Sequence, residues 1–146
     1  MEISFYHLTT TPLERALPSL VEKAYEAGLR TLVLVDKAKI RQIDDTLWTA
    51  NQQKFLPHGT QNPESQPIFI SDKISDAAAN DNRKILAVTN GQKYEDNQGF
   101  TKVLDIFDGN IENDLSAARE RFKYYKDKGF EIKYWFQDDK GKWVQK

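Results

Sequence analysis

The chain has 146 residues and a formal net charge of −1, so its length fits one domain and its charge argues against a globally basic nucleic-acid binder. It has no cysteine, which excludes disulfides, thiolate metal sites and cysteine nucleophiles. The first residues show no basic segment followed by an apolar run, and no stretch approaches the ~18 apolar residues of a membrane span. We therefore expect a cytoplasmic protein.

The first predicted unit is a strand, a helix and a second strand. Residues 3–8 form a short apolar and aromatic run with strand character. Thr11 is expected to cap a helix that ends before Gly28, and Pro18 either kinks this helix or marks its start. Residues 31–35 are a continuous apolar, β-branched run, the pattern of a strand buried on both faces.

The middle of the chain alternates less regularly. Apolar residues recur with a helical period in one segment only, and the remaining segments are short strands or polar connections. The predicted elements are a helix at 37–50, a long loop at 51–67, a strand at 67–70, a polar, helix-poor segment at 71–82, a strand at 84–89 and a surface loop at 92–99.

The last third predicts a strand at 101–107, a helix at about 111–128 and a strand at 130–136. The tail from 137 to 146 is expected to turn back or to be mobile, which leaves 1–136 as one domain. Strands separated by helical segments require crossovers between parallel strands. The predicted fold is therefore α/β, with a mostly parallel, twisted sheet that carries helices on both faces.

The turn after the first strand, residues 8–12, lacks the glycines with which a dinucleotide fold approaches a pyrophosphate. No G-x-x-x-x-G-K-[ST] occurs elsewhere. The two histidines, His7 and His58, have no metal-ligand spacing, and no serine has a G-x-S-x-G setting. The prediction is a Rossmann-like fold without the glycine-rich nucleotide loop, with no cofactor, no metal site and no catalytic residue.

The helix near the C-terminus carries cations around an aromatic ring. Arg119, Phe122, Lys123 and Lys126 are spaced i, i+3, i+4, i+7, so they share one face. One interpretation is a binding site for an acidic, partly apolar ligand such as a peptide or a nucleic-acid strand. The other is a surface helix with one half-buried phenylalanine and scattered lysines.

A second segment places large apolar residues at the end of a helix and in the loop after it. These residues are Trp48, Phe55, Leu56 and Pro57. Because loops usually run on the surface, these side chains either reach into the core or form an exposed apolar anchor for a partner. The pattern leaves both interpretations open.

Together the two segments resemble a known family. The stretches Leu47-Trp48, Phe55-Leu56-Pro57-His58 and Ala118-Arg119-Glu120-Arg121-Phe122-Lys123-Tyr124-Tyr125, with Gly129-Phe130, are similar to those of the chi subunit of bacterial DNA polymerase III holoenzyme. The resemblance covers most of the chain and is weakest across residues 60–100.

The resemblance implies an accessory subunit of DNA replication without catalysis of its own. Such proteins pair with the psi subunit of the clamp loader and bind the acidic C-terminal tail of single-stranded DNA-binding protein. By resemblance, Arg119, Phe122 and Lys123 receive that tail. The family has a basic residue one turn earlier, where this chain has Leu115. This difference either weakens the site or leaves the role of the missing cation to Lys126 or Lys128.

By the same resemblance, Phe55 matches the region that contacts psi, with Trp48, Leu56 and Pro57 nearby. Contact with DNA would be mainly indirect. Two other classes stay open from the residues alone. One is a small enzyme or nucleotide-binding protein on a Rossmann-like fold, and the other is a direct single-stranded nucleic-acid binder.

Overall fold

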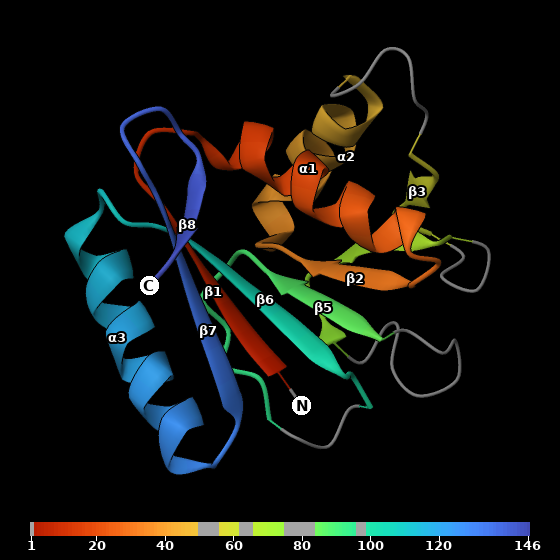
Figure 1. Ribbon diagram of the computed structural model, residues 1–146. Coiled ribbons are helices and arrows are strands. Elements are labelled where there is room, and N and C mark those ends of the chain that lie inside the picture. Colours follow the sequence, from red (N-terminus) through yellow and green to blue (C-terminus); the bar gives the residue numbers. More distant parts are fainter. Residues whose placement is uncertain (1, 50–55, 62–65, 75–83, 96–98) are drawn as a thin grey trace.

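A sheet of eight strands runs through the described part of the molecule (Figure 1). The computed structural model describes residues 2–49, 56–61, 66–74, 84–95 and 99–146. The strands are β1 (Glu2–Leu8), β2 (Thr31–Leu34), β3 (His58–Gly59), β4 (Ile68–Ser71), β5 (Ile85–Val88), β6 (Lys102–Asp108), β7 (Glu131–Gln137) and β8 (Trp143–Gln145). They lie in the order β3-β4-β2-β5-β6-β1-β7-β8, and all neighbours are parallel except β7 and β8.

Helices cover both faces of this sheet. They are α1 (Leu13–Glu26), the short 3-10 helix η1 (Lys37–Lys39), α2 (Ile40–Thr49) and α3 (Glu112–Asp127). Figure 1 shows α1 and α2 together on one side, while α3 lies on the other. The prediction of a mostly parallel α/β sheet with helices on both faces is confirmed. In the described ranges no helix has the length and apolar character needed to cross a membrane.

The two faces have separate apolar cores. Under α1 and α2 the core includes Leu17, Val33 and Ile43, and under α3 it includes Phe5 and Tyr125. All four residues of β2 are buried, since helices or loops cover both of its faces. The continuous apolar run predicted this correctly, because such a run suits a strand without a solvent face.

The turn between β1 and α1 differs from the prediction. The N-cap position is Pro12, not Thr11, and no side chain caps the helix. The hydroxyl of Thr11 instead accepts a hydrogen bond from the Gln137 side-chain amide at 2.8 Å. The helix begins at Leu13 and runs through Pro18, so that proline does not mark its start.

Two segments predicted as irregular have more structure than expected, and the C-terminal segment turns back, which is one of the two outcomes predicted for it. The predicted loop at 51–67 contains β3, whose two residues are too few to show a periodic pattern. The predicted surface loop at 92–99 contains Tyr94, which is fully buried. In the C-terminal segment β8 pairs with β7, and Trp143 packs edge-on against Tyr6 with ring centroids 5.1 Å apart.

Candidate functional site

A pocket of about 460 Å³ lies between α3 and the adjacent strands β1 and β7, all of which contribute to its lining. We call it the α3 pocket. Its lining comes from four different parts of the chain: Leu115, Ala118, Arg119 and Phe122 on α3, His7 on β1, Tyr134 on β7, and Lys146.

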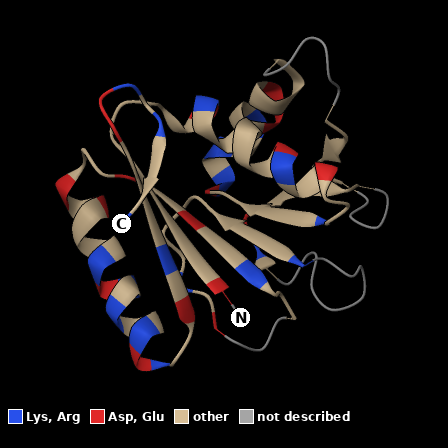
Figure 2. Cartoon of the chain, in the orientation of Figure 1, with Lys and Arg blue, Asp and Glu red and all other residues tan. Residues whose placement is uncertain are grey.

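The structure brings two of the four predicted helix residues to this pocket. Arg119 and Phe122 line it, whereas Lys123 and Lys126 are exposed on α3 and are not among its lining residues. Figure 2 shows Lys and Arg in blue along this helix, with acidic residues between them. The two lysines therefore do not form part of the pocket wall, but they add positive electrostatic potential near it.

The apolar wall of the pocket is anchored in the core. The half-buried Phe122 ring lies 5.6 Å from the ring of Phe5 and 6.2 Å from the ring of Tyr134, centroid to centroid. Leu115 adds aliphatic surface to the pocket. The pocket thus combines apolar walls with the guanidinium of Arg119, a combination that suits a ligand with both a carboxylate and an apolar side chain.

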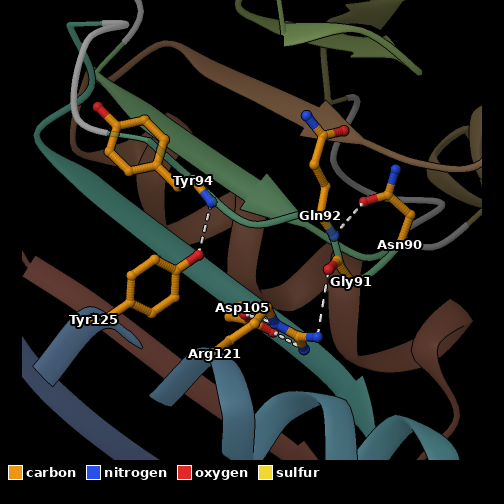
Figure 3. Close-up of polar contacts among 7 residues, drawn as sticks. All are labelled: Asn90, Gly91, Gln92, Tyr94, Asp105, Arg121 and Tyr125. Atoms are coloured by element: carbon orange, nitrogen blue, oxygen red, sulfur yellow. Dashed lines mark hydrogen bonds and ion pairs between the residues drawn. The ribbon is translucent and has the colours of Figure 1, made fainter. Parts of the chain in front are cut away.

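A buried ion pair fixes α3 against the sheet (Figure 3). Arg121 donates from Nε and Nη2 to the two carboxylate oxygens of Asp105 on β6, at 2.7 and 3.0 Å. Asp105 is 1% exposed and Arg121 is 6% exposed. Burial raises the pKa of Asp105, although the hydrogen bonds and charge of Arg121 oppose the rise. The sequence prediction missed this pair, whose signal is a charged residue inside the apolar run at 101–107.

Two further contacts connect α3 with the loop after β5 (Figure 3). Arg121 donates from Nη1 to the carbonyl of Gly91 at 3.4 Å, and the Tyr125 hydroxyl accepts from the backbone N–H of Tyr94 at 2.8 Å. Burial raises the pKa of Tyr125 to about 12, so its hydroxyl stays protonated. These contacts hold one side of α3 to the protein, and the adjoining face presents Arg119 and Phe122 to the pocket.

His7 reaches the pocket in a way that the sequence prediction missed. Its Nδ1 lies 2.7 Å from the hydroxyl oxygen of Tyr134, so its partner is a side chain far along the sequence. The two residues come from adjacent parallel strands. Neither the spacing of His7 nor its neighbours in sequence could have indicated this partner.

The second predicted surface is only partly described. Trp48, near the end of α2, is 55% exposed, and its ring meets the ring of His58 at 4.9 Å. Leu56 is 3% exposed and belongs to the core under α1 and α2, so its side chain is not at the surface. Pro57 is half-buried, and Phe55 lies outside the described residues. We call Trp48 and Pro57 the Trp48 surface.

In dinucleotide-binding folds the turn after the first strand holds a phosphate, but here a side chain of the protein itself occupies that turn. The backbone N–H groups of Thr9, Thr10 and Thr11 all donate to the side-chain oxygen of Gln137, at 3.0, 3.2 and 3.2 Å. Successive amides that converge in this way would otherwise form an anion-binding nest. Among the described residues, no group of three or more His, Asp or Glu is placed to hold a metal ion.

Replacing Gln137 by alanine should lower the free energy of unfolding by about 1–3 kcal/mol, because three amides lose their acceptor. Gln137→Glu is the matched control, since it retains an acceptor for the amides but loses the donor to Thr11 and Gly141. Urea unfolding should rank wild type above Glu and Glu above Ala. Equal stability of all three proteins would mean that water replaces the side chain without cost.

Comparison with known proteins gives two matches. The sequence profile of the family described as "DNA polymerase III chi subunit, HolC" matches residues 1–133. A protein of Rickettsia prowazekii (strain Madrid E) named "Probable DNA polymerase III subunit chi" is 30% identical over 77 residues, which cover 50% of this chain and 47% of that protein. The chain therefore matches about half the length of this curated relative.

Proposed function

Because the chain belongs to the family of DNA polymerase III chi subunits, we propose that it is a non-catalytic accessory subunit that links the clamp loader to single-stranded DNA-binding protein. One partner is the acidic C-terminal tail of that protein, which binds in the α3 pocket. The other is the psi subunit of the clamp loader, which binds the Trp48 surface. DNA is reached mainly through these partners.

The composition of the α3 pocket supports the tail contact. An acidic tail that ends in an apolar residue presents carboxylates beside a hydrophobic side chain. Arg119 can form a forked pair of hydrogen bonds with a carboxylate, and the walls of Phe122 and Leu115 accept the apolar side chain. Lys123 and Lys126 are exposed on the same helix and attract the rest of the acidic tail through the solvent.

The exposure of Trp48 supports the psi contact. An indole that is 55% exposed beside the buried His58 leaves a large apolar area in water. Aromatic side chains of this kind are common anchors of protein interfaces. In this proposal the buried Leu56 does not touch psi but supports the loop that does. Phe55, in the adjoining segment, makes contact with psi.

The charge around the larger hollow at the carboxyl ends of β1, β5 and β6 weighs against a nucleotide-binding role. This hollow, about 720 Å³, is lined by the carboxylates of Glu14, Asp36, Asp108 and Asp114 against Lys39 and Arg121. Arg121 is already paired with Asp105. The excess of negative charge would repel a phosphate, and the amides of the first turn are occupied by Gln137.

Arg119→Ala should weaken binding of a synthetic peptide with the tail sequence by about 1.5–3 kcal/mol, the range for a hydrogen bond to a charged group. Isothermal titration calorimetry measures this directly. Raised salt should weaken the wild-type complex as well, because several exposed cations take part. The matched control is Lys23→Ala, which removes one exposed positive charge from α1. Equal affinities of the Arg119 variant and the wild type would show that the peptide does not bind in this pocket.

A further inference from the structure

The pocket wall opposite α3 is a hydrogen-bonded pair of polar rings. His7 Nδ1 and the Tyr134 hydroxyl oxygen are 2.7 Å apart, and the two rings meet edge to face at 5.9 Å. The other side of the imidazole packs on Gly109, where an added Cβ would overlap Nε2 of His7. The imidazole is therefore held between a backbone segment and Tyr134, and both residues of the pair line the pocket.

Charged groups from several elements face His7. Burial, then Lys146 and then Arg119 of α3, lower the pKa of this histidine, whereas Asp108 at the end of β6 raises it. The pKa therefore lies below the ordinary value of 6.5, and His7 is neutral in the unliganded protein at neutral pH. Burial also raises the pKa of Tyr134, so its hydroxyl keeps its proton and can donate.

We propose that the His7–Tyr134 pair is a proton-linked part of the acidic-peptide site. A carboxylate of the peptide accepts a hydrogen bond from the Tyr134 hydroxyl, and His7 takes up one proton from solvent as the peptide binds. The proposal rests on the proposed function, because it concerns the same pocket.

Hydrogen-bond direction and charge together explain the coupling. When Nδ1 has no hydrogen, it accepts from the Tyr134 hydroxyl, whose hydrogen then points away from a ligand. When Nδ1 carries a hydrogen, in imidazolium or in the neutral Nδ1–H tautomer, it donates to the tyrosine oxygen, and the hydroxyl hydrogen is free to turn toward a carboxylate. The bound carboxylate then neutralises the cations that disfavour imidazolium in the free pocket, and this charge effect makes the peptide complex prefer protonated His7.

The direction of the pH dependence follows from linkage. Since the peptide raises the pKa of His7, affinity should increase as pH falls through the pKa of the complex. It should level off below the lower pKa of the free protein. We expect about two- to sixfold tighter binding at pH 6 than at pH 8, because a rise of one pKa unit limits the whole change to tenfold and the change is complete only below the pKa of the free protein.

Two measurements on the wild-type protein test the proposal. Calorimetry at pH 6.5 in buffers of different ionisation enthalpy, with the synthetic tail peptide as probe, should show proton uptake on binding. NMR should show the His7 titration midpoint move upward when the peptide saturates the protein. The chain has only two histidines. The His58 resonance is therefore an internal reference, and it should not respond to the peptide.

Two variants separate the roles of the pair. His7→Asn keeps a polar atom near Tyr134 but cannot be charged, so it should lose the pH dependence and the proton uptake. Tyr134→Phe removes the donor and should weaken binding at every pH. If the wild type binds the peptide without proton uptake and the His7 midpoint does not move, this proposal is wrong and the proposed function stands. If the peptide does not bind at any pH, both are wrong.

Discussion

Arg121→Met should lower the free energy of unfolding by about 3–5 kcal/mol, the usual cost of removing one partner from a buried ion pair. The reason is the carboxylate that remains. Asp105 is 1% exposed on β6, and its two oxygens accept from Arg121 at 2.7 and 3.0 Å. Without Arg121 this charge stays in the core with no cation beside it. Urea unfolding at pH 7 measures the loss.

The pH dependence of this loss identifies its cause. Burial already raises the pKa of Asp105, and removal of the Arg121 charge should raise it further. A carboxyl group whose folded pKa is above its unfolded value stabilises the folded state in acid and loses that contribution as pH rises. The deficit of Arg121→Met should therefore be greatest at neutral pH and shrink as pH falls. A deficit that stays constant with pH would indicate lost packing instead.

Two control variants accompany the Arg121→Met experiment. Lys102→Met removes one cation from a partly exposed pair with Glu2, 3.2 Å apart, and should cost less than about 1 kcal/mol, because Lys133 still pairs with Glu2. The double variant Asp105→Leu/Arg121→Met replaces both charges by apolar side chains and should recover much of the stability. A double variant no more stable than Arg121→Met alone would show that shape, rather than charge, is lost.

Trp48→Ala should weaken the complex with psi by about 2–4 kcal/mol, as loss of a central aromatic anchor does. It should leave binding of the tail peptide unchanged, because the Trp48 surface and the α3 pocket share no described residue. Arg119→Ala should give the reverse pattern. Calorimetry with each partner and each variant measures all four affinities.

Folding controls decide how a loss of psi binding is understood. Trp48 is 55% exposed, so its replacement should change the melting temperature little, and Tyr25→Ala, an exposed aromatic on α1, is the matched control. Phe55→Ala tests the adjoining segment in the same assays. If Trp48→Ala melts much earlier and loses both partners, the indole is structural and the two-surface proposal is wrong.

The elements predicted well are those whose signal is local. The β-branched run at 31–35 predicted a strand buried on both faces, and Gly28 has a φ of +76° just beyond the end of α1, as expected for a C′ glycine. The spacing of Arg119 and Phe122 likewise placed both on one helical face, and both line the pocket. Periodicity within one helix or strand is sufficient for predictions of this kind.

The features missed by the prediction depend on partners far along the chain. Thr11 is a residue type that favours the N-cap position. Its hydroxyl and backbone amide, however, are hydrogen-bonded to the side chain of Gln137. Tyr94 lies among polar residues, yet its backbone N–H is bonded to Tyr125 and its ring is in the core. One wall of the α3 pocket has the same origin, since His7 and Tyr134 meet only when β1 pairs with β7.

The position of β1 has a consequence for synthesis of the chain. This first strand lies inside the sheet, and its two neighbours are β6 and β7, so Ile3 pairs with Val103 and Phe5 with Tyr134. A ribosome must therefore make most of the protein before β1 can be paired. Until then its apolar side chains are exposed on the nascent chain, where unpaired strands are prone to aggregate. We expect the sheet to close late, after β7 has left the exit tunnel.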